Sequence, residues 1–137
     1  MNDDFYAWCV YKYGSNKVGM VKVVRGVKHG YLAMVMDYSE KSKLKIDMRY
    51  YIEAMLDEFP YEVKQVKTMP CNNKLFKINK EAKKLDNELK AILYTYVMKA
   101  MFLCKQAQPN ITTVIGFLSS QVKTPNKGDW DKFMQVM

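Results

Sequence analysis

The strongest constraint on the fold is a long apolar stripe in the second half of the chain. Apolar residues recur there at intervals of three and four for about five helical turns. Asp86 and Glu88 precede the stripe, and their negative charges suit the positive N-terminal end of a helix. The stripe consists of Leu89, Ile92, Leu93, Tyr96, Val97, Ala100 and Leu103. The sequence therefore predicts a helix from residue 86 onward with one buried face.

Weaker patterns before this stripe predict a helix followed by strands. Apolar residues at helical spacing indicate a short amphipathic helix over residues 4–13, with Asp3 and Asp4 as its cap. Alternating residues predict a strand over residues 18–23, and His29 falls in an expected turn. Residues 31–48 predict a hairpin whose turn lies at residues 39–42.

Helical patterns dominate the rest of the chain. They cover residues 48–59, 109–122 and 130–137, while residues 61–85 lack periodicity and are expected to form a long loop. Pro60 ends the first of these helices because proline lacks the amide donor and restricts the residue before it. We therefore expect an α+β fold with an N-terminal helix, an antiparallel hairpin and a mostly helical C-terminal half.

The charge of the chain favours a polyanionic partner. The 22 Lys and Arg residues outnumber the 14 Asp and Glu residues, which gives a net charge of +8 over 137 residues. The excess falls in two zones, residues 17–45 and residues 61–90, on either side of an acidic predicted helix. The candidate nucleic-acid contacts are Lys22, Arg25, Lys28, Lys41, Lys43, Lys45, Lys64 and Lys67.

Several classes of site have little support in the sequence. The three cysteines lie far apart without a Cys-x-x-Cys pair, and His29 is the only histidine, so we expect no metal or cofactor in this chain. No glycine-rich phosphate loop or hydrolase elbow occurs. Apolar runs fall well short of the roughly 20 residues that cross a bilayer. We therefore expect no membrane partner and an intracellular location, with cytoplasm and nucleus both open.

Tyrosines near the lysines leave two interpretations open. Tyr6, Tyr11 and Tyr13 belong to the first predicted helix, and Tyr50 and Tyr51 to the second. Their rings can stack on nucleic-acid bases, or they can pack within the protein, which is the more common role.

An ordered series of short strings runs through most of the chain. It comprises KHGYLAM at residues 28–34, DYS at 37–39, KIDM at 45–48, MP at 69–70, LF at 75–76, FLCK at 102–105, QPNI at 108–111 and FLS at 117–119. In this order and with these gaps, the series resembles the reverse transcriptase of copia-type LTR retrotransposons. The family-motif positions are Tyr31, Leu32, Ala33, Met34, Pro109 and Trp130.

The resemblance implies a division of the chain and a nucleic-acid partner. Residues 1–48 look like the end of a palm, including a hairpin that contacts the primer, and residues 49–137 look like a helical thumb or connection. An RNA or DNA template-primer is the implied partner. The aspartates with which the family binds Mg²⁺ have no counterpart among the matched strings, so we expect no polymerase activity from this chain alone and Mg²⁺ only in the intact enzyme.

The sequence departs from the family pattern at four positions. Ala33 replaces the usual glycine, Gly30 replaces an aspartate, and Gln108 and Asn110 replace an arginine and an aspartate beside the helix-start proline. An alternative therefore remains open. The chain can be a small basic module that binds nucleic acid or protein, derived from such an element or unrelated to it, with apolar surface for self-association or for binding the rest of a palm and fingers.

Overall fold

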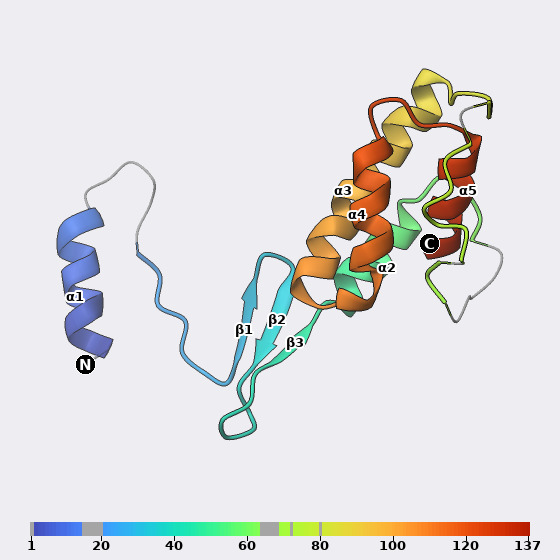
Figure 1. Cartoon of the computed structure of the whole chain (residues 1–137). Helices are drawn as coiled ribbons and strands as arrows, with labels where there is room; N and C mark the ends of the chain where they lie inside the picture. Colours follow the sequence, from blue (N-terminus) through green and yellow to red (C-terminus); the bar gives the residue numbers. More distant parts are fainter. Residues whose placement is uncertain (1, 15–20, 64–68, 72, 80) are drawn as a thin grey trace.

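The computed structural model describes residues 2–14, 21–63, 69–71, 73–79 and 81–137. The chain forms an N-terminal helix, a three-stranded antiparallel sheet and a mostly helical C-terminal half, so the predicted α+β class is confirmed. Helix α1 lies at one end of the molecule, and the sheet lies between it and the helical body, which holds the C-terminus (Figure 1).

Helix α3 (Asn87–Gln106) is the centre of the helical body. It contacts α2 (Arg49–Asp57), α4 (Thr112–Gln121) and α5 (Lys127–Val136), together with the short 3₁₀ helix η1 (Pro109–Ile111). The Asp86 side chain accepts a hydrogen bond from the Leu89 amide at 2.8 Å and so caps α3, as the sequence predicts. The buried residues of α3 are Leu93, Tyr96, Val97, Ala100, Leu103 and Cys104.

Polar contacts join α2 to α3 above the apolar core. The Tyr96 hydroxyl donates to the Glu58 carbonyl at 2.6 Å, and the Tyr51 hydroxyl donates to the Lys99 carbonyl at 3.1 Å. The Lys99 ammonium forms an ion pair with Glu58, and this hydrogen bond raises the pKa of Lys99. These contacts fix the direction in which α2, and the sheet before it, leave the helical body.

The sheet consists of β1 (Lys28–Tyr31), β2 (Met34–Asp37) and β3 (Lys45–Asp47), in that order. The predicted hairpin corresponds to β2 and β3, in which Met36 pairs with Ile46. Met34 and Met48 belong to the same buried cluster as the helices, so residues from the sheet and from the C-terminal half share one core. The family resemblance implies a division between residues 48 and 49, which is where α2 begins. That this point divides two domains stays a prediction.

Two expectations about the segment before β2 are wrong. Residues 21–25 form no strand, and the remaining part of the strand predicted over residues 18–23 lies outside the described residues. His29 lies within β1 rather than in a turn, and its Nε2 is 2.9 Å from the Gly26 carbonyl oxygen. The strand that precedes β2 is β1 at residues 28–31, and it forms by pairing with β2. Such pairing depends on the neighbouring strand and not on alternation within the segment itself.

The predicted first helix is present as α1 (Asn2–Tyr13), but its apolar face is not buried against the described residues. Its aromatic rings contact one another instead, with Trp8 6.0 Å from both Phe5 and Tyr13. Asp3 and Asp4 lie in the first turn rather than before it, and Asp3 forms an ion pair with Arg25. Helix α1 therefore adds nothing to the shared core.

The turn between β1 and β2 holds two non-glycine residues with left-handed backbone. Tyr31 pairs with Met34, so Leu32 and Ala33 form a two-residue loop, and their φ angles are 47° and 60°. Positive φ at both positions is the conformation of a type I′ loop, which matches the twist of the flanking strands but is unfavourable for residues with a Cβ atom. The tight hairpin is therefore strained at these two positions.

We predict that Ala33→Gly stabilises the protein by about 1 kcal/mol, because a left-handed alanine costs about 1–2 kcal/mol and the greater freedom of glycine in the unfolded chain offsets part of that gain. Urea unfolding measures the change. Ala91→Gly, on the exposed side of α3, is the matched control and should destabilise by about 1 kcal/mol. Destabilisation by both variants would contradict the assignment of strain to Ala33.

Candidate nucleic-acid interface

A shallow hollow of about 650 Å³ lies between the tip of the β1–β2 hairpin and the start of α2. Gly30, Val35 and Asp47 pair across the three strands, so they share the face of the sheet that lines this hollow. A side chain at Gly30 would meet only open space, and the glycine thus widens the hollow. We call this feature the hairpin hollow.

Two tyrosines at the rim of the hairpin hollow are available to a ligand. Tyr31 is 58% exposed at the hairpin tip, and Tyr50 is 80% exposed on the first turn of α2. Tyr50 and Tyr51 have the same two possible roles in the sequence, but they lie in different environments in the structure. Tyr51 packs against Phe102 with ring centroids 5.4 Å apart, and its burial raises the pKa of its hydroxyl. Packing is thus the role of Tyr51, and stacking on a base stays open for Tyr50 and Tyr31.

The electrostatics of the hairpin hollow are set by Asp47 and Arg49. The Asp47 carboxylate accepts hydrogen bonds from the Arg49 backbone amide at 3.0 Å and from its guanidinium at 2.5–3.1 Å. The guanidinium, and then the backbone amide, lower the pKa of Asp47 from 3.8 to about 2. Arg49 remains largely exposed and still presents donors toward the hollow. Arg49 falls outside both basic zones of the sequence and is therefore not among the predicted contacts.

A cluster of candidate cations, separate from the hairpin hollow, surrounds the turn between β2 and β3. Lys41, Lys43 and Lys45 are all exposed there. Lys43 forms an ion pair with Glu40 at 2.8 Å, and on the sheet Lys28 pairs with Asp37 at 3.2 Å. The Lys43–Glu40 pair is exposed on both sides and therefore weak, so the Lys43 ammonium can exchange its carboxylate for a phosphate at little cost, whereas the Asp37 side chain is only 21% exposed in its pair with Lys28.

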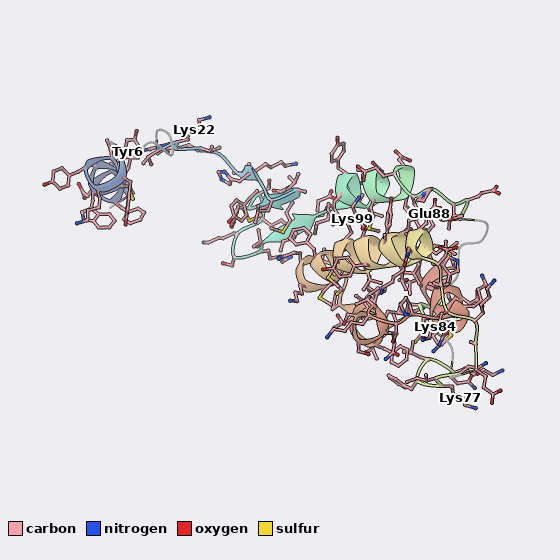
Figure 2. The ribbon with its side chains drawn as sticks, turned by 90° about the horizontal axis from the view of Figure 1, so that it is seen from above. Tyr6, Lys22, Lys77, Lys84, Glu88 and Lys99 are labelled. Carbon is pink, nitrogen blue, oxygen red and sulfur yellow. The ribbon has the colours of Figure 1, made fainter. Side chains whose placement is uncertain are left out.

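The other predicted cations do not join this cluster. Lys22 and Arg25 lie on the segment between α1 and β1, and Figure 2 shows Lys22 near Tyr6 of α1, at the opposite end of the molecule from Lys77 and Lys84. Lys64 and Lys67 lie outside the described residues. Lys77 and Lys84 of the second basic zone therefore lie on a different surface from Lys22, and the first zone is itself divided between the segment before β1 and the turn between β2 and β3.

The remaining family-motif positions are structural. Met34 is buried beneath the hairpin tip, and Pro109 begins η1. Trp130 is buried in α5, where its ring contacts Tyr61 at 5.3 Å and Phe133 at 5.8 Å. Of the family-motif positions, Tyr31, Leu32, Ala33 and Met34 line the hairpin hollow together with the exposed Arg49.

Within the part of the chain that the structure describes, no group of three or more His, Cys, Asp or Glu side chains lies close enough to hold a metal ion. Among the described residues, every helix is too short or too polar to pass through a lipid bilayer. Comparison with protein-family models, with curated proteins and with solved structures finds no match to this chain.

We predict that Arg49→Gln raises the pKa of Asp47 toward 3.8 and leaves that of Asp37 at about 2, since hydrogen bonds from Ser39 hold the latter. Ser39→Ala should have the reverse effect. Both folded-state values lie below the unfolded ones, so each pair stabilises the protein above about pH 4, and its contribution is lost as the pH falls toward 2. NMR titration of the carboxyl carbons measures both values, and equal shifts of both carboxyls in either variant would contradict the prediction.

Proposed function

We propose that the chain belongs to the reverse transcriptase region of a copia-type retrotransposon, from the end of the palm into the thumb, and that it contacts the backbone of a template-primer. The ordered strings from residue 28 to residue 119 carry this proposal. The hairpin adds support, because its left-handed Ala33 occupies the position at which the family has glycine. A backbone with φ of 60° is one that glycine adopts readily.

The proposed contact is electrostatic and independent of base sequence. Lys41 and Lys43 lie in the turn between β2 and β3, Lys45 begins β3, and the exposed Arg49 and Tyr50 begin α2 after the other end of β3. Lysines that neutralise phosphates release bound counterions, so binding weakens as salt rises. The proposal assigns no catalytic step to these residues, and the chain by itself is not expected to synthesise DNA.

We predict that Lys41→Gln with Lys45→Gln weakens binding to an RNA–DNA hybrid. If both lysines contact phosphates, the slope of log affinity against log salt should decrease in magnitude by up to about 2. Fluorescence anisotropy at several salt concentrations measures the slope. Lys105→Gln with Lys123→Gln removes the same charge from exposed positions in the helical body, and this control should leave the slope near that of the unchanged chain. Equal effects of the two pairs, or binding without salt dependence, would contradict a hairpin interface.

A second candidate function is protein interaction through α1. Phe5, Trp8 and Tyr11 are exposed on this helix, and a hollow of about 510 Å³ separates it from residues 21–25. Large exposed apolar patches are typical of surfaces that bind protein. Full burial of a Phe side chain is favourable by roughly 1.5–3 kcal/mol, from which the entropic cost of association is subtracted. This observation favours self-association, or binding to the palm and fingers of a larger enzyme.

We predict that the mass of the chain in solution rises with its concentration, and that Phe5→Ser with Trp8→Ser holds it at the monomer mass. Light scattering coupled to gel filtration measures both. Tyr94→Ser, which removes an exposed aromatic ring from α3, is the control and should associate like the unchanged chain. A monomer at all concentrations would exclude self-association through α1.

A further inference from the structure

The segment of residues 73–79 and 81–84, which we call the lysine loop, is held in place along its length by α5 and the turn before it. The Lys132 ammonium donates to the Lys77 carbonyl at 2.8 Å, and the Asn126 side chain donates to the Asn79 carbonyl at 3.2 Å. The Lys127 amide donates to the Lys83 carbonyl at 2.9 Å. These bonds order the loop before any ligand arrives. Binding therefore does not carry the entropic cost of ordering it.

Phe76 projects from this ordered loop. Its neighbour Leu75 is 3% exposed and anchors the loop in the core, whereas Phe76 is 68% exposed. The Phe76 ring meets the Phe117 ring edge to face at 5.6 Å, and the Lys132 ammonium lies 4.7 Å from the centre of the Phe117 ring. Phe76 is thus held in one orientation while most of its ring stays open to a flat ligand.

The charges of the lysine loop, which carries Phe76, are mostly positive. Lys77, Lys83 and Lys84 are exposed, and within the described part of the chain their ammonium groups form no ion pair. Figure 2 shows Lys77 and Lys84 at the end of the molecule away from Lys22. Glu81 is the only acidic residue of the lysine loop. An open aromatic ring among lysines matches the chemistry of a polynucleotide strand, in which a base stacks on the ring and phosphates meet the cations.

We propose that the lysine loop binds single-stranded nucleic acid, with an unpaired base stacked on Phe76 and adjacent phosphates on Lys77, Lys83 and Lys84. Bases within a duplex are already stacked on one another, so the open ring selects unpaired ones. This site rests on the proposed function in taking nucleic acid as the ligand, but it uses a different surface from the hairpin. In this arrangement, a single-stranded extension of the template-primer would bind at the helical end of the molecule.

The observations favour nucleic acid over a lipid surface. Insertion into a membrane interface requires several apolar side chains that extend together from a basic surface. Here Leu75 is buried in the core, Phe76 rests edge to face against Phe117, and the other large apolar side chain exposed on the described lysine loop is Ile78, at 49%. One fixed ring suits stacking on a base better than burial among acyl chains.

The test uses the full chain and a fluorescently labelled oligo-uridine strand, with an RNA–DNA hybrid as the second ligand. Phe76→Ala and Phe76→Leu should each weaken binding of the single strand by about 5- to 100-fold, since neither side chain can stack. Both should change binding of the hybrid by less than about 2-fold. Phe76→Trp should retain or strengthen binding of the single strand. Tyr94→Ala, at another exposed aromatic position, should alter neither affinity.

The outcomes separate this inference from the hairpin interface. Unchanged binding of the single strand by both Phe76→Ala and Phe76→Leu would overturn the proposed loop site, whatever Lys41→Gln with Lys45→Gln does to the hybrid. Loss of hybrid binding only in the lysine pair, with loss of single-strand binding only in the Phe76 variants, would support both sites. Vesicles rich in phosphatidylserine form a further arm, and Phe76-dependent vesicle binding without single-strand binding would overturn the proposal in favour of a lipid surface.

Discussion

The buried face of α3 is the interaction on which the rest of the structure depends. Leu93 and Val97 are fully buried along this face, and α2, α4 and α5 all contact the helix. Phe133 of α5 and Ile115 of α4 are completely buried in the same cluster. Burial of apolar surface is the main favourable term in folding, so this core holds both candidate surfaces in place.

The hairpin is joined to this core through α2 rather than through the sheet alone. Met48 is buried directly before α2, and the Tyr96 hydroxyl holds the carbonyl at the other end of that helix. The orientation of the hairpin hollow therefore follows from the packing of α2 on α3. A short three-stranded sheet with exposed edges would be marginal without such support.

The two proposed contacts share a physical arrangement. Each places exposed cations and an exposed ring on a segment whose backbone is fixed by neighbours, with Tyr50 near Arg49 in one and Phe76 near Lys77 in the other. The net charge of +8 supplies attraction over a distance, whereas the fixed rings supply short-range contacts. The first surface suits a duplex backbone, and the second suits an unpaired strand.

The sequence alone determined the helices with strong periodicity, the β2–β3 hairpin and the excess of positive charge. These features depend on local spacing and on charges that can be counted, so residues 87–106 are helical where the stripe predicts a helix. Tertiary structure decided that His29 lies in a strand, that Tyr50 is exposed while Tyr51 is packed, and that Asn126 and Lys132 hold the lysine loop. Each of these depends on a partner distant in the chain, and neither periodicity nor composition records which partner a backbone group or a ring will meet.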